Sequence, residues 1–119
     1  MPNKKYLSML GMARRAGKLS MGHDMAVKSV IEHKTDLVIF ASDASKRLVD
    51  EFEVSIQKSK HDVAVKIIPE TINDIHMALG YKAGVITVND INFSGRIKEL
   101  INQVVVEISA RHVHVSKED

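Results

Sequence analysis

Residues 12–28, MARRAGKLSMGHDMAVK, decide the fold that we predict for this chain. Apolar residues at helical spacing precede the two arginines and predict a helix over 4–16, which Gly17 stops. The next residues, 18–21, predict a short extended piece. Gly22 then opens a second helix that continues to about His33. Two helices and a short strand therefore meet around two glycines.

Strands and helices alternate along the chain beyond this stretch. Apolar runs rich in β-branched residues predict strands within 36–43, 63–69 and 84–88. Helices are predicted to begin after Ser45 and after the Thr71–Asp74 capping pair, and a last helix covers 93–101. This order predicts a layered α/β sandwich around a small, mixed and largely parallel sheet.

Length and composition limit the class of protein. A chain of 119 residues with 45% hydrophobic residues fits one compact domain. No apolar run approaches the ~20 residues of a membrane helix, and the first residues do not resemble a signal peptide. Cysteine is absent, which excludes disulfides and thiolate metal sites. We expect a cytoplasmic protein that makes no contact with a membrane.

The charge is distributed unevenly. Residues 1–34 carry a formal charge of +5, whereas residues 35–119 carry −3, although the net charge of the chain is only +2. The first part of the chain can therefore attract phosphate groups. The alternative is an ordinary solvated helix surface.

The residues around Gly22 favour binding of nucleic acid over catalysis. No nucleophile–base grouping and no phosphate-loop motif is present, so we expect neither an enzyme nor a cofactor. A helix that begins at glycine offers free N–H groups to a phosphate, with Lys28 within reach and Asp24 able to accept from a base. Aromatic residues make up only 4% of the chain, which favours a folded RNA over a stacked single strand.

Three segments carry a resemblance to a known family. LGMARRAGKLSMGHDMAVKSV, LVIFASDAS and ALGYKAGVITVND resemble the ribosomal protein L7Ae/L30e family, especially its small bacterial YlxQ-like members. The resemblance covers about residues 4–101 and implies a three-layer α/β/α sandwich. Many members bind kink-turn RNA, in which a three-nucleotide bulge precedes tandem sheared G·A pairs. The resemblance thus implies a structured RNA partner, a kink-turn or ribosomal RNA.

The resemblance also implies which residues contact RNA. Lys18 matches the family's lysine before the short strand, Gly22 its glycine before the second helix, and Lys28 its helix lysine. Asp24 lies among the positions that read bases in the family. With the arginines that precede them, the candidate RNA-binding residues are Arg14, Arg15, Lys18, Gly22, His23, Asp24, Lys28, Ser42, Asp43, Tyr81, Lys82 and Ala83. The chain departs from archaeal kink-turn binders, which have Asn-Glu where it has Asp24-Met25. Asp43 and Ser45 have an alternative role as caps of the third predicted helix.

The last residues, 103–119, differ from the rest. QVVVEISARHVHVSKED is rich in β-branched residues and predicts an edge strand or an extended tail, with a domain boundary near Asn102. On a strand, His112 and His114 would share one side and are weak candidates for zinc ligands. This segment also resembles the start of the phosphate propanoyltransferases of bacterial microcompartments.

These observations support three hypotheses. The leading hypothesis is a non-catalytic RNA-binding protein. Residues 1–102 would form its RNA-binding domain, and residues 103–119 would form a C-terminal extension. The second is a protein-interaction module linked to an ethanolamine or propanediol microcompartment, with protein partners bound through the tail. The third is a fragment of a metal-dependent enzyme that uses the two tail histidines.

Overall fold

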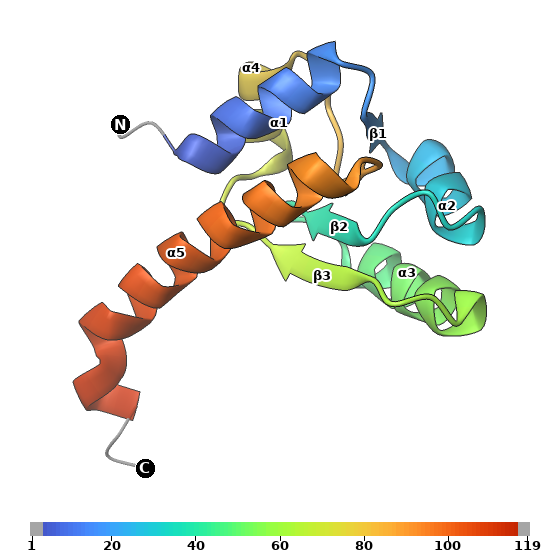
Figure 1. Cartoon of the computed structure of the whole chain (residues 1–119). Coiled ribbons are helices and arrows are strands. Elements are labelled where there is room, and N and C mark those ends of the chain that lie inside the picture. The colour runs from blue at the N-terminus through green and yellow to red at the C-terminus, as the bar shows by residue number, and fades with distance from the viewer. Residues whose placement is uncertain (1–3, 117–119) are drawn as a thin grey trace.

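The computed structural model describes the backbone of residues 4–116 and the side chains of residues 4–104. In chain order the elements are α1 (Lys5–Arg15), β1 (Leu19–Met21), α2 (His23–Ile31), β2 (Leu37–Phe40), α3 (Lys46–Ser59), β3 (Ala64–Ile67), α4 (Ile72–Leu79), β4 (Val85–Val88) and α5 (Ile91–Ser116). Figure 1 shows their arrangement. Within residues 4–116, no helix is long and apolar enough to cross a membrane.

The four strands form one mixed sheet in the order β1-β4-β2-β3. Only β2 and β3 pair in parallel, whereas β4 pairs antiparallel with both β1 and β2. The prediction of a largely parallel sheet is therefore wrong. The reason is the connection between β3 and β4. Ile67, at the end of β3, and Val85, at the start of β4, both align with Phe40. The connection therefore starts and ends at the same end of the sheet, so β4 runs in the opposite direction to β2 and β3.

Helices cover both faces of the sheet, which confirms the three-layer α/β/α sandwich. Helices α1, α4 and α5 pack on one face through a core that includes Leu10, Ile75 and Ile97. On the other face, α2 and α3 enclose a second core around Val30 and Phe52. All side chains of β2 and β4 are buried between these layers, as their apolar runs predicted.

The predicted helix ends are confirmed by their caps. The Ser45 hydroxyl accepts a hydrogen bond from the backbone of Leu48 at the start of α3. Thr71 and Asp74 form a reciprocal capping box on α4, and Gly80 ends that helix in the left-handed region. The apolar spacing of the second predicted helix also predicts that Ile31 faces the core, but this last residue of α2 is 61% exposed.

The last helix extends much further than its apolar spacing predicted. Helix α5 continues to Ser116, so the prediction of an edge strand or extended tail is wrong. Strand preference is weak, and a helix that is already packed on the core through Ile97 and Ile101 can propagate through such residues. Figure 1 shows the end of α5 projecting away from the sheet.

The helical backbone of α5 also bears on the predicted domain boundary and on the two histidines of residues 103–119. The domain boundary near Asn102 falls inside one continuous helix, and the division of the chain there stays a prediction. The side chains of His112 and His114 lie outside the described part of the structure. Strand alternation, which would have placed them on one side, does not apply to a helical backbone.

Candidate functional site

One end of the sheet brings together three segments that the sequence analysis singled out. β1 and β2 finish at this end, and β4 starts there. Backbone hydrogen bonds join the segments beyond the strands: Gly22 donates to Val85 at 3.0 Å and Ala41 donates to Gly84 at 2.9 Å. We call the surface formed by Gly22, His23, Asp24, Tyr81 and Lys82 the Gly22 surface.

Gly22 itself has a backbone conformation that favours glycine. It precedes α2 as the N-cap residue with φ of +91° and ψ of 162°, a region that L side chains rarely adopt. No side chain caps the first turn of α2. The N–H groups of a first turn have no partners within their helix and carry a partial positive charge. The start of α2 therefore has the chemistry of an anion site.

Tyr81 connects the loop before β4 to this helix start. A Cβ atom placed on Gly22 would lie 3.8 Å from the Tyr81 hydroxyl oxygen and 3.9 Å from a ring carbon. The tyrosine side chain is nevertheless 49% exposed, and Lys82 beside it is exposed as well. An aromatic ring and a cation thus lie next to the start of α2.

His23 contacts two carboxylates, that of Asp24 in its own helix and that of Glu51 in α3. Its Nδ1 lies 2.9 Å from Asp24 Oδ1, and its Nε2 lies 3.2 Å from Glu51 Oε1. The imidazole also meets the ring of Phe52 edge-on, with centroids 5.9 Å apart. Two carboxylate oxygens facing both ring nitrogens suit the protonated imidazolium, which donates from both. The hydrogen bond with Asp24 raises the pKa of His23, and Glu51 adds to this shift.

The positive side chains that the sequence predicted to form one basic surface lie in two separate parts of the molecule. Lys28 is exposed on α2, the helix that starts at Gly22. Lys18 precedes β1 at the opposite end of the sheet, and its Nζ lies 3.9 Å from Asp90. Arg14 and Arg15 are exposed in the last turn of α1, before Lys18. The structure therefore does not bring the two arginines and Lys18 together with the Gly22 surface.

Two further predicted residues have structural roles. Asp43 Oδ1 accepts a hydrogen bond of 2.8 Å from the backbone of Ile72, so Asp43 caps α4 and not the third helix. Ala83 is only 5% exposed and belongs to the core, which corrects its expected position on the surface. Ser42 is exposed, and its backbone N–H donates to the carbonyl of Glu70 at 2.8 Å.

Some residues that help to build this surface were missed. Glu51 is far from His23 in sequence, and no local pattern marks it. Gly84 is packed tightly: a Cβ atom there would lie 3.3 Å from Leu48 Cδ2 and 3.5 Å from Ile72 Cδ1. A side chain at Gly84 would therefore require the Leu48 side chain of α3 to shift by a few tenths of an ångström. The second glycine of the GYKAG motif, Gly84, was a usable sequence signal for this close approach.

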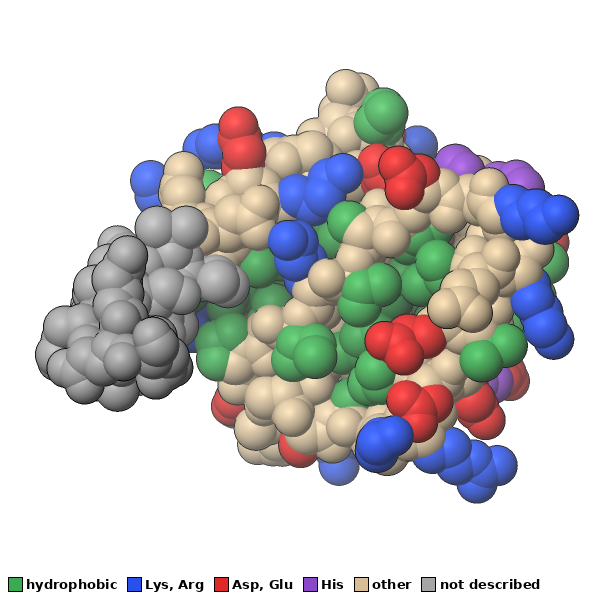
Figure 2. Space-filling view, turned by 90° about the horizontal axis from the view of Figure 1, so that it is seen from below, with side chains coloured by type: hydrophobic (Ala, Val, Ile, Leu, Met, Phe, Trp, Pro, Cys, Tyr) green, Lys and Arg blue, Asp and Glu red, His purple; other side chains and the backbone are tan. Residues whose placement is uncertain are grey.

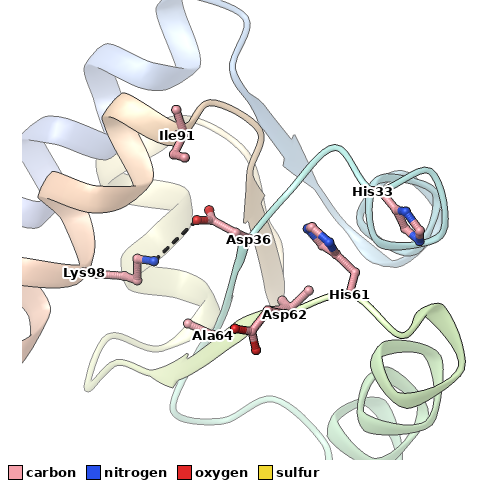
Figure 3. A pocket seen from close by; sticks show the side chains of 8 residues that line it. His33, Asp36, His61, Asp62, Ala64, Ile91 and Lys98 are labelled. Atoms are coloured by element: carbon pink, nitrogen blue, oxygen red, sulfur yellow. Dashed lines mark hydrogen bonds and ion pairs between the residues drawn. The ribbon is translucent and has the colours of Figure 1, made fainter.

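The opposite end of the sheet holds a hollow of about 510 Å³ lined by His33, Asp36, His61, Asp62, Val63, Ala64, Ile91 and Lys98. Figure 3 shows these side chains and the contact between Lys98 and Asp36, whose atoms are 3.4 Å apart. The imidazole rings of His33 and His61 stack, with centroids 5.0 Å apart. Among the described side chains, no group of three His, Cys, Asp or Glu residues has an arrangement that could hold a metal ion.

Comparisons with known proteins show what this chain is similar to. No family model matches the sequence. The RNA-binding protein YlxQ of Enterococcus faecium is 28% identical over 99 residues, which cover 82% of this chain and 92% of that protein. A solved structure of a Bacillus halodurans C protein of unknown function has a TM-score of 0.75 at 31% identity and covers 84% of this chain and 99% of its own.

A second solved structure shows the same fold at lower identity. The 15.5kD RNA binding protein of Giardia lamblia has a TM-score of 0.63 at 18% identity. The match covers 89% of this chain and 92% of the other.

Proposed function

We propose that this chain, which resembles the L7Ae/L30e family, is a non-catalytic, cytoplasmic RNA-binding protein that recognises kink-turn-like structured RNA. The relative from Enterococcus faecium carries the name of an RNA-binding protein and matches most of this chain. Ribosomal RNA, which contains such folded elements, belongs to the proposed class of targets.

The position of Tyr81 next to Gly22 is the observation that carries the proposal. It places the exposed tyrosine and Lys82 beside the start of α2. Residues so far apart in sequence form one surface only because β1 and β4 are paired. A sharply bent RNA needs such a compact surface, since phosphates and an unstacked base come close together at its bend.

Groups on the Gly22 surface and on helix α2 would each contact a different part of the RNA. The first N–H groups of α2 and the Lys28 ammonium would hold phosphates. Asp24, whose side chain is 99% exposed, would accept from a base edge. Tyr81 would pack against an unstacked nucleotide of the bulge.

His23 gives this surface a feature that offsets the departure at Asp24-Met25. Met25 offers no strong hydrogen-bond group, although it is 57% exposed. The imidazole fixes Asp24 through one carboxylate oxygen, Oδ1, and leaves Oδ2 for a ligand. Holding this side chain before binding lowers the entropy cost of ordering it in the complex.

A titration with two RNAs tests the proposal. One is a standard kink-turn, and the other has its tandem G·A pairs replaced by Watson–Crick pairs. We expect tight binding of the first and at least about tenfold weaker binding of the second, with a steep loss of affinity at higher salt. Equal and weak binding of both RNAs would contradict kink-turn recognition while leaving the fold unchanged.

The other two hypotheses gain no support from the described side chains. Both rest on residues 103–119, of which the structure describes the helical backbone to Ser116 but the side chains only of Gln103 and Val104. They remain predictions, and co-purification with microcompartment proteins or metal analysis of the full chain would test them.

A further inference from the structure

Strand β3 forms an open edge of the sheet. It pairs with β2, and within the described residues no other strand lies beside it. Ala64 and Ile68 donate backbone hydrogen bonds to Asp36 and Phe40 on this inner side. Backbone groups alternate along a strand, so those of Val65 and Ile67 are directed outward. The edge therefore offers both donors and acceptors to another strand.

The side chains of this edge are also unusual for a surface strand. Val65 and Ile67 are 38% and 60% exposed. Natural proteins protect open edges with charges or proline, because an apolar edge pairs readily with another chain. Figure 2 shows apolar side chains gathered on the face seen from below, the side on which β3 lies in Figure 1.

We infer that β3 pairs antiparallel with β3 of a second copy of this chain and joins the two sheets into one. A two-fold axis requires a surface that fits itself. If Val65 faces Val65 of the second copy, then Val63 faces Ile67, and the outward backbone groups meet in hydrogen-bonded pairs. The contact on that side of the strand is then entirely apolar.

The charges of this segment select the same register. On the other side of the strand, Lys66 faces Ala64 of the second copy and reaches Asp62 diagonally. Side chains alternate along an extended backbone, so a backbone that stays extended before Ala64 places Asp62 on the same side as Ala64 and Lys66. The neighbouring register would instead put Lys66 directly opposite Lys66, and like charges in that position are destabilising. A second copy therefore fits both the apolar and the charged positions of β3.

The pairing leaves the Gly22 surface free and does not rest on the proposed function. Gly22 and Tyr81 lie at the end of the sheet, next to β1 and β4, whereas β3 is the opposite edge. A dimer formed through β3 would therefore carry two copies of the Gly22 surface. RNA binding and self-association can succeed or fail independently.

Sedimentation of the full chain tests the inference. A pairing of this small size predicts weak association, so the dimer should form as the chain concentration rises toward about 100 µM. Val65→Lys places two ammonium groups opposite each other and should raise the dissociation constant at least about tenfold. Val54→Lys is the matched control, because Val54 is also an exposed valine (49%) but belongs to α3 and not to the edge strand.

A cross-linking experiment covers the case in which Val65→Lys does not fold. The natural chain has no cysteine, so Val65→Cys introduces a single thiol. Facing residues of antiparallel strands have Cα atoms about 5.5 Å apart, within the range of a disulfide. We expect Val65→Cys to form a covalent dimer under mild oxidation much faster than Val54→Cys. A chain that stays monomeric at about 100 µM, or equal cross-linking at both positions, would overturn the inference.

Discussion

The two ends of the sheet hold their polar groups in different ways. At one end, the Gly22 surface exposes Asp24, Tyr81 and Lys82 beside the uncapped start of α2. At the other end, polar groups satisfy one another: Lys18 contacts Asp90 and Lys98 contacts Asp36. One end is therefore suited to a ligand and the other to internal stability.

This difference shows that charge along a sequence is not charge available at a surface. The +5 charge of residues 1–34 predicted one basic corner, yet Lys18 is directed to a carboxylate at the far end. Only Lys28 belongs to the helix that starts at Gly22. The RNA affinity in our proposal depends on position more than on the number of cations.

The largest expected effect is that of Gly22→Ala at the ligand end. An L residue forced to φ of +91° is strained by about 1–3 kcal/mol, and relief of this strain would turn the start of α2 away from Tyr81. We expect a lower free energy of unfolding in urea and loss of RNA binding. Gly95→Ala is the control: it lies inside α5, where an added Cβ would meet no side chain or neighbouring element within 4 Å, and should stabilise by about 0.5–1 kcal/mol. A loss of stability in both variants would contradict the role of positive φ.

Thr35→Val tests the opposite end of the sheet. The buried hydroxyl lies 2.6 Å from the carbonyl oxygen of Val88 and accepts from the backbone N–H of Leu37 at 3.1 Å. Valine keeps the shape but leaves these groups unpaired, which should cost about 1–3 kcal/mol in urea unfolding. RNA affinity of the folded protein should not change. Weaker RNA binding at unchanged stability would show that the two ends are coupled.

Lys28→Ala has a smaller effect, confined to binding. Because Lys28 is exposed, we expect normal stability, weaker binding of the kink-turn and a salt dependence whose logarithmic slope falls by about 1. Lys58→Ala, at an exposed lysine in the last turn of α3, is the control and should leave the slope unchanged. An equal change in both variants would indicate that only the net charge matters.

The smallest effect is the pH dependence set by His23. Its pKa is raised in the folded state by Asp24 and Glu51, so protonation favours folding. This contribution is complete below the pKa of the unfolded chain and is lost as pH rises through the raised value. His23→Gln should therefore reduce the difference in stability between about pH 5.5 and pH 8.5. An unchanged difference in urea midpoints would show that His23 does not contribute.

Much of the fold was predictable because its signals are local. Ser45, the Thr71–Asp74 pair and Gly80 act within one turn of the helices that they cap, and the buried strands are continuous apolar runs. The resemblance to the L7Ae/L30e family, confirmed by the comparisons, supplied the three-layer arrangement. The direction of β4 in the sheet was predicted wrongly. This strand starts at the end of the sheet where β3 finishes, and no local sequence signal encodes that path.

The candidate site was predictable only in part. Gly22, Asp24 and Tyr81 were selected from the sequence, but their roles in RNA binding stay predictions. The burial of Ala83 and the capping of α4 by Asp43 depend on partners distant in the chain. The contact between His23 and Glu51 likewise required α2 and α3 to pack side by side.

The sequence by itself determined the alternation of helices and strands, the caps and the need for glycine before α2, because backbone preference and hydrophobic periodicity act over a few residues. Tertiary structure alone decided which of these segments meet. Pairing of β1 with β4 set Tyr81 beside Gly22, and the sheet order left β3 with a free edge. Both outcomes arise because strand pairing joins residues that are remote in the chain, where local preferences carry no information.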